Sequence, residues 1–231
     1  MGLPECFCWT RFGTEAGQPV SGILARKERE RVANGGFFIW GIGNAVGPSI
    51  RELVRRNSSP EVLFSPIKSA PKAKDISPPA VAAWTAGEAL DGSQYSLPQH
   101  SLVTSRYDPE TPRDGHYALV CFSPRPITDA QSEDRIVFDG LNNLLTGRRI
   151  GASQVTAVVR LDAARSDNAS SYEVAIRAEL VYPYFIRLKN PVLLPHASPE
   201  KASGTDWIVN AFRLVREHNR SILPQQLSLQ A

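Results

Sequence analysis

The chain has 231 residues, a length that suits one large domain or one domain with additions. Apolar residues make up 42% and charged residues 21% of it, which excludes a wholly disordered chain, a fibrous repeat and a small disulfide-rich protein. With 26 Lys and Arg against 23 Asp and Glu the formal net charge is +3, so a uniformly basic coat is excluded but a local basic patch is not. The 18 prolines favour short strands and loops over a helical bundle.

The sequence predicts a cytoplasmic protein. It has no run of about 20 apolar residues, so we expect no transmembrane helix and no membrane partner. The first residues, MGLPECFCWTRF, lack a basic segment followed by an apolar one, which argues against secretion. The odd set Cys6, Cys8 and Cys121 suits a reducing compartment. Since no second close Cys or His pair completes a zinc site, we expect no metal and interpret Cys6 and Cys8 as core-facing thiols on a strand.

Strands and helices alternate in the first third of the chain. The pattern predicts strands at residues 6–12, 37–40 and 61–67. It predicts a solvated, charged helix at residues 21–33 and a second helix that Pro48 opens and that ends near Asn57.

The rest of the chain is richer in strands. We expect a hairpin over residues 80–97 turned at Asp91-Gly92, and strands at 101–107, 116–123 and 155–161. We expect a strand that passes into a short helix at residues 136–145 and a long strand-rich stretch at residues 172–194. A final helix is expected at residues 205–220, followed by a flexible tail at residues 223–231. Numerous short strands with few helices predict an α+β fold around a curled sheet or barrel, rather than a parallel doubly wound sheet.

Gly41, Gly43 and Gly47 lie between a strand and a helix, in the segment GIGNAVG. Glycines in that position let a backbone approach a pyrophosphate at a helix N-terminus, as in dinucleotide-binding proteins. A second strand ending in an acidic residue is expected about twenty positions further on, but this chain has Ser65 and Lys68 there. A nucleotide- or dinucleotide-binding enzyme is therefore kept as an alternative.

The same segment has a second interpretation. Trp40-Gly41-Ile42-Gly43-Asn44 followed by a helix resembles the Trp-x-Gly-Val-Arg-Asn segment of EVE domains, which belong to the PUA-like superfamily. The order of elements around it and the late stretch YEVAIRAELVYPYFIRLKNPVLLP are also similar to that family. The likeness covers the first 70 residues and residues 155–195. It implies a single PUA-like barrel with flanking helices over residues 1–222, in which residues 70–150 are an insertion. One residue is missing before Gly41, and Gly43 replaces the usual Arg.

The resemblance implies a non-enzymatic, cofactor-free reader that holds a modified base, in DNA rather than RNA, as the sensing module of a defence or regulatory system. A flipped base needs aromatic faces for stacking and polar groups for its edge. The candidate base-binding residues are Trp9, Thr10, Trp40, Gly41, Ile42, Asn44, Ser65 and Trp84. The alternative is that Trp9 and Trp40 are core residues and that Asn44 caps a helix or shapes a turn.

A basic stretch follows the glycine-rich segment. Positive side chains outnumber negative ones between residues 51 and 74, where phosphates would be held. The candidate phosphate-binding residues are Arg51, Arg55, Lys68, Lys72 and Lys74. The alternative is a solvated charged face.

No catalytic motif is present, so no catalytic residue is expected. A protein-interaction module is the remaining alternative, with Tyr182, Tyr184 and Phe185 forming an exposed aromatic strip.

Overall fold

The computed structural model describes residues 3–12, 20–43, 46–66, 81–97, 102–104, 116–126, 135–137, 140–151, 155–162, 171–174 and 176–194. The chain divides into two compact units, each assembled from separate segments. The first unit takes Met1–Phe12, Ala45–Lys68 and Pro124–Leu180. The second takes Gly13–Asn44, Ser69–Ser123 and Val181–Ala231. The helix predicted at 205–220 and the tail at 223–231 lie outside the described residues.

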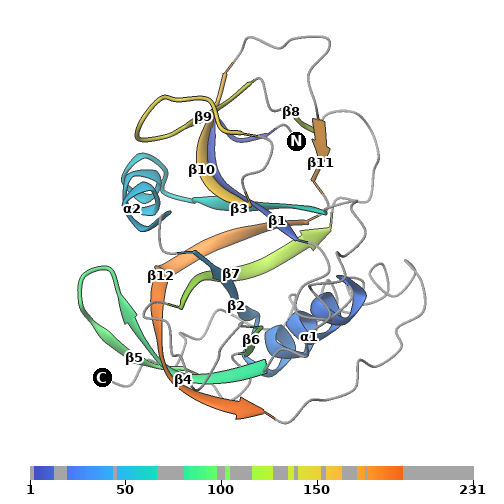
Figure 1. Ribbon diagram of the computed structural model, residues 1–231, viewed down its shortest axis with the longest axis vertical. Coiled ribbons are helices and arrows are strands. Elements are labelled where there is room, and N and C mark those ends of the chain that lie inside the picture. The colour runs from blue at the N-terminus through green and yellow to red at the C-terminus, as the bar shows by residue number, and fades with distance from the viewer. Residues whose placement is uncertain are drawn as a thin grey trace. The chain divides into compact units, whose positions relative to one another are not determined.

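The first unit is built on a mixed sheet (Figure 1). Its strand β1 (Cys6–Phe12) pairs in parallel with β3 (Glu61–Pro66) and antiparallel with β10 (Thr156–Leu161). Beyond β10 the sheet continues to β9 (Leu141–Asn143), and on the other side β3 pairs with the first residues of β12 (Ile176–Leu194). β1 is therefore an inner strand with a neighbour on both edges.

β1 is buried on both faces, which explains its almost continuously apolar sequence CFCWTRF. One face carries Phe7 and Trp9, both completely buried in an apolar cluster with Leu63 and Val159. The other face carries Cys8, also completely buried. The strand and the core-facing thiols predicted from the sequence are confirmed.

α2 (Gly47–Arg56) contacts β1 and β10 and buries Ile50 and Leu53 completely. Its first turn holds Pro48, whose missing N–H has no intrahelical partner at that position in any case. Burial raises the pKa of the Cys6 thiol, and Arg56, at the other end of α2, lies close enough to Cys6 to offset part of that rise. α2 therefore lies on the face of the sheet that carries Cys6 and Cys8.

The first unit also contains a small pair of antiparallel strands, β8 (Arg135–Val137) and β11 (Ser171–Glu173). β8 confirms the strand predicted near residue 136. Residues 141–143, predicted as part of a short helix, instead form β9, because their backbone groups pair with β10.

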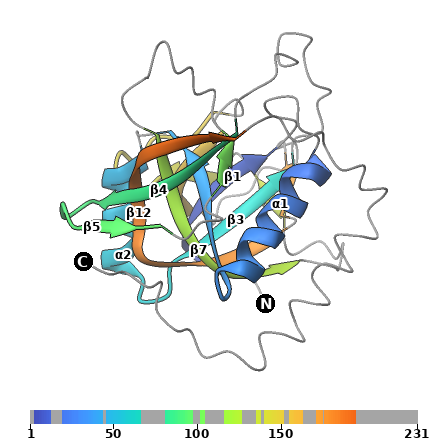
Figure 2. The same cartoon turned by 90° about the horizontal axis from the view of Figure 1, so that it is seen from below.

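The second unit is built from antiparallel pairs (Figure 2). β2 (Phe37–Ile42) pairs with β7 (Tyr117–Pro126), which begins in this unit. The second half of β12 pairs with β4 (Val81–Ala89). β4 also pairs with β5 (Gln94–Ser96) and β6 (Leu102–Thr104). The apolar core of the unit comprises Phe37, Ile39, Trp84, Ala118, Val120, Ile186 and Leu188.

The hairpin predicted at residues 80–97 is confirmed as β4 and β5. Gly92 in its turn has φ +87°, which a side chain would disfavour. The Asp91 carboxylate accepts a hydrogen bond from the Ser93 N–H at 2.9 Å, which closes the turn locally.

α1 (Val20–Ala33) runs beside β2 and uses charged side chains to do so (Figure 2). The Ile39 N–H donates to Glu30 Oε1 at 2.8 Å, and Lys27 donates to the Ile39 carbonyl. Lys27 and Glu30 also form an ion pair at 2.6 Å, and both side chains are buried. Glu30 and Lys27 thus satisfy the backbone N–H and carbonyl of Ile39, as a neighbouring strand would do. The predicted helix is confirmed, but the prediction that its charged residues are solvated is wrong for these two.

Strands make up most of the described residues, and they pair both parallel and antiparallel. The helices among the described residues are α1 and α2. This agrees with the curled sheet predicted from the sequence. The described part of residues 70–150 supplies all the strands from β4 to β9.

Candidate nucleic-acid interface

Three of the predicted base-binding residues lie in the first unit. Trp9 and Ser65 are each 0% exposed, and the Trp9 indole N–H donates to Ser65 Oγ at 3.0 Å. Thr10 is 1% exposed, and its hydroxyl shares a 3.0 Å hydrogen bond with that of Thr156. Trp9 and Ser65 are in contact, and their polar groups hydrogen-bond to each other inside the core.

Four further candidates lie in the second unit, at the end of β2 and on β4. Trp40 is 9% exposed and Trp84 3% exposed, whereas Gly41 is exposed and Ile42 half-buried. Gly43 is also exposed, and a Cβ added there would meet no atom within 4 Å. The backbone after Trp40 is therefore open to an approaching ligand. Asn44 lies outside the described residues.

Of the five predicted phosphate-binding residues, two are among the described residues and three are not. Arg51 and Arg55 lie on α2 with exposed side chains, and Arg56 beside them is 44% exposed. Lys68, Lys72 and Lys74 lie outside the described residues. The basic face predicted near residue 51 is thus placed on a helix of the first unit.

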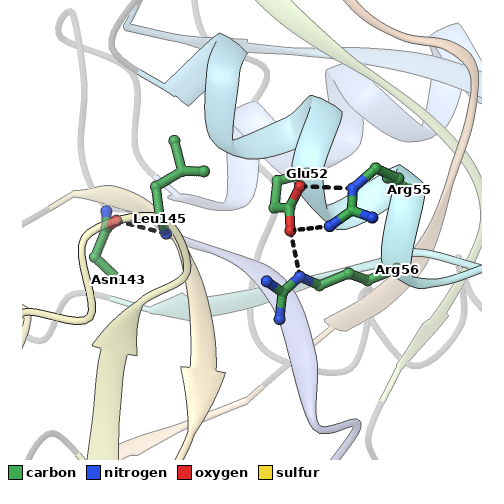
Figure 3. A network of polar contacts seen from close by, with 5 residues as sticks. All are labelled: Glu52, Arg55, Arg56, Asn143 and Leu145. Atoms are coloured by element: carbon green, nitrogen blue, oxygen red, sulfur yellow. Dashed lines mark hydrogen bonds and ion pairs between the residues drawn. The ribbon is translucent and has the colours of Figure 1, made fainter.

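Glu52 organises the arginines of α2 (Figure 3). Its carboxylate accepts hydrogen bonds from Arg55 at 2.7 and 2.9 Å and from Arg56 Nε at 2.5 Å. The hydrogen bonds from Arg55 and then Arg56 lower the pKa of Glu52 to about 2, so it stays ionised. One carboxylate holds two guanidinium groups in place and leaves one net positive charge among the three side chains.

A turn after β9 presents two more arginines, Arg148 and Arg149, both exposed. Asn143 Oδ1 accepts hydrogen bonds from the N–H groups of Leu145 at 3.0 Å and Thr146 at 2.9 Å, as the left side of Figure 3 shows for Leu145. The turn is closed by the Gly147 N–H, which donates to the Asn143 carbonyl at 2.9 Å. These hydrogen bonds hold the backbone of the turn from which Arg148 and Arg149 follow.

Register relates two of these arginines, Arg149 and Arg160. Arg160 lies directly opposite Cys6 on β1 and Asn142 on β9, and Asn142 in turn bridges to Arg149. Directly paired residues on antiparallel strands have their side chains on the same face. Burial and then Glu5 raise the pKa of the Cys6 thiol, and the charges of Arg56 and Arg160 partly offset that rise, so both guanidinium groups lie near Cys6.

We call this group the arginine surface. It consists of Arg51, Arg55, Arg56, Arg148, Arg149 and Arg160, all exposed in the first unit. Arg148 and Arg149 belong to none of the motifs recognised in the sequence, and only strand register links Arg149 to Arg160. Exposed guanidinium groups match phosphate oxygens, to which they donate paired hydrogen bonds.

Cys6, Cys8 and Cys121 are all buried. Burial raises the pKa of Cys8 to about 12, and burial followed by Glu5 raises the pKa of Cys6. Neutral thiols are poor ligands and nucleophiles. Within the described ranges no group of three or more His, Cys, Asp or Glu is arranged to hold a metal ion.

The glycine-rich segment follows a strand with antiparallel pairing. β2 pairs antiparallel with β7, and no residues of β3 pair with it among those described. A dinucleotide-binding unit places the next strand parallel to the first, with the helix between them. The pairing therefore does not supply the context that this alternative needs.

His116 lies beside this segment in the second unit and gives a pH-dependent prediction. Its ring contacts Trp84 at a centroid distance of 5.0 Å, and burial lowers its pKa from the ordinary value of 6.5. Below that value the unfolded chain binds the proton more readily than the folded one, so stability falls as the pH falls. Between about pH 7 and pH 5, we expect His116→Gln to show a flatter loss of unfolding free energy than the wild type in urea titrations. Identical slopes would contradict the prediction.

In the described part of the chain, no helix is long and apolar enough to cross a membrane. No protein-family profile, curated protein sequence or solved structure matches this chain. What the protein does has to be argued from its own residues.

Proposed function

We propose that the protein binds nucleic acid, DNA in preference to RNA, and reads a modified base in it. The observation that carries the proposal is the arginine surface of the first unit, where six exposed arginines lie on α2, the turn after β9 and β10. Arginine guanidinium groups bind phosphates through paired hydrogen bonds and release condensed counterions when they do so.

Glu52 supports the phosphate-binding role in a specific way. By holding Arg55 and Arg56 it fixes two otherwise flexible side chains, which reduces the entropy lost when a phosphate binds. It also lowers the local positive charge, which limits indiscriminate binding to polyanions.

The base-reading part of the proposal rests on the resemblance to EVE domains and on the end of β2. Gly41 and Gly43 are exposed there, and the open space at Gly43 allows a planar ligand to approach the backbone. Trp40, which precedes them, supplies an aromatic side chain that is 9% exposed. Stacking on an aromatic ring contributes about 1–3 kcal/mol per base.

Binding of matched duplexes, with and without one modified base, at several salt concentrations tests the phosphate-binding role. We expect Arg55→Gln with Arg56→Gln to weaken both duplexes equally and to reduce the salt slope by about 0.9 for each phosphate that is no longer neutralised. Glu52→Gln should tighten both, because the increase in local positive charge outweighs the loss of the side-chain order that Glu52 provides. Arg29→Gln, an exposed arginine of α1 in the second unit, is the matched control and should change neither.

The base-reading part has its own variant. Gly43→Val adds bulk to open space and should leave the melting temperature unchanged while removing the preference for the modified duplex. Gly43→Ala is the smaller control. A wild-type protein that binds both duplexes equally would overturn base reading, and unchanged binding in the arginine variants would overturn the role of the arginine surface.

A further inference from the structure

A group of tyrosines lies at the surface of the second unit, away from its apolar core. Tyr95 comes from β5, and Tyr182 and Tyr184 come from β12. Tyr182 is 52% exposed, and the other two are half-buried. Phe185, predicted to belong to an exposed strip with Tyr182 and Tyr184, is instead 2% exposed and stacks on Tyr117 at 5.3 Å, so that part of the prediction is wrong.

The three rings meet nearly at right angles. Tyr95 and Tyr182 have their centroids 6.1 Å apart with an interplanar angle of 79°, and Tyr182 and Tyr184 have theirs 6.0 Å apart with an angle of 88°. Perpendicular rings present π-faces in different directions, so several faces can surround one small group. Parallel stacking would have hidden those faces.

Hydrogen bonds tie the rings to a carboxylate. The Tyr95 hydroxyl donates to the Tyr182 oxygen at 2.6 Å, and the Tyr182 hydroxyl donates to Asp91 Oδ2 at 3.4 Å. Tyr184 is held with φ +63°, a conformation that is costly for a residue with a side chain. Strained residues of this kind concentrate at ligand-binding sites.

The local charge favours a cation over a phosphate. Hydrogen bonds from Ser93 and Tyr182 keep the pKa of Asp91 below its ordinary value, so the carboxylate is ionised at neutral pH. The nearby Glu88 pairs with Lys189 at 3.0 Å, whereas no Lys or Arg stands among the described contacts of Asp91. A carboxylate without a basic partner among the described residues, beside exposed and half-buried aromatic rings, attracts a positive group that gives up its water easily.

We propose that Tyr95, Tyr182, Tyr184 and Asp91 form a binding site for a quaternary or trimethylated ammonium group. Such a cation is bulky, weakly hydrated and attracted by the π-faces of aromatic rings, while a nearby carboxylate adds a long-range attraction. The site lies on a hairpin and a strand of the second unit and shares no residue with the arginine surface. It therefore adds a ligand to the protein that does not depend on nucleic-acid binding.

Titration of the full chain with choline chloride, followed by NMR or calorimetry, tests the proposal. The control ligand is 3,3-dimethylbutan-1-ol, which has the shape of choline but a carbon in place of the charged nitrogen. We expect saturable choline binding and binding of the neutral alcohol about tenfold weaker or less. Equal binding of the two, or no saturable binding of choline, would overturn the proposal.

Variants locate the site. Tyr182→Ala should abolish choline binding, and Tyr182→Phe should retain most of it, because the ring stays. Asp91→Asn should weaken binding several-fold, whereas Glu88→Gln, a carboxylate of the same hairpin already paired with Lys189, should not. Full binding by a folded Tyr182→Ala protein would overturn the assignment, and Tyr182→Phe guards against the case in which Tyr182→Ala does not fold.

A peptide carrying trimethyllysine, compared with the same peptide carrying unmodified lysine, separates the two sources of this chemistry. Tighter binding of the trimethyllysine peptide than of choline would support a methylated protein as the ligand. Tighter binding of choline would support a choline-bearing small molecule or headgroup.

Discussion

Replacing Glu30 by Leu is expected to lower the free energy of unfolding by about 3–5 kcal/mol, because the Lys27 ammonium loses its carboxylate inside the protein. The Ile39 N–H loses its acceptor in the same variant. Urea denaturation measures the change. The double variant Lys27→Met with Glu30→Leu should recover part of the loss, since it removes both charges together.

Glu52→Gln is the matched control for this experiment. Glu52 also pairs with basic residues of its own helix, but its partners Arg55 and Arg56 are exposed. Ion pairs of that kind contribute little to stability. If Glu30→Leu lowered the free energy of unfolding no more than Glu52→Gln does, the buried pair of Glu30 and Lys27 would not be important for stability.

Trp9→Ala is the second change with a large expected effect, a loss of about 3–5 kcal/mol in unfolding free energy. The indole is completely buried among Phe7, Leu63 and Val159, and the truncation would leave a large cavity. Ser65→Ala removes the hydroxyl that accepts the indole N–H and should cost about 1–3 kcal/mol.

Trp9→Phe separates the core role of Trp9 from the base-binding role predicted from the sequence. As a core residue, its replacement should cost stability and leave the affinity of the folded protein for nucleic acid unchanged. A Trp9→Phe protein with wild-type stability and impaired binding of the modified duplex would support the base-binding role instead.

The positions of the elements were predictable because their signals are local. The apolar run at residues 6–12 is β1, Pro48 lies in the first turn of α2, and Asp91-Gly92 turns the hairpin of β4 and β5. Each of these features depends on side chains only a few residues apart. A short stretch of sequence around each feature is therefore enough to predict it.

The roles of individual residues were harder to predict because they depend on distant partners. From the sequence, Glu30 and Lys27 are expected on the solvated face of a helix. Only their hydrogen bonds to Ile39 on β2 show that they have a partner inside the protein. Trp9 resembles a candidate for base stacking until Ser65, 56 residues away, is known to accept its N–H. Arg149 gains its relation to Arg160 through Asn142, by strand register alone.

The position of β1 in its sheet has a consequence for the synthesis of the protein. Cys6–Phe12 emerges from the ribosome well before its antiparallel partner Thr156–Leu161 is made. Until then, one edge of an apolar strand has no partner, and pairing over such a separation is slow. CFCWTRF has few charges and strong β-forming residues, the features of segments that aggregate or attract chaperones. We therefore expect the nascent chain to need protection of this segment until β10 is complete.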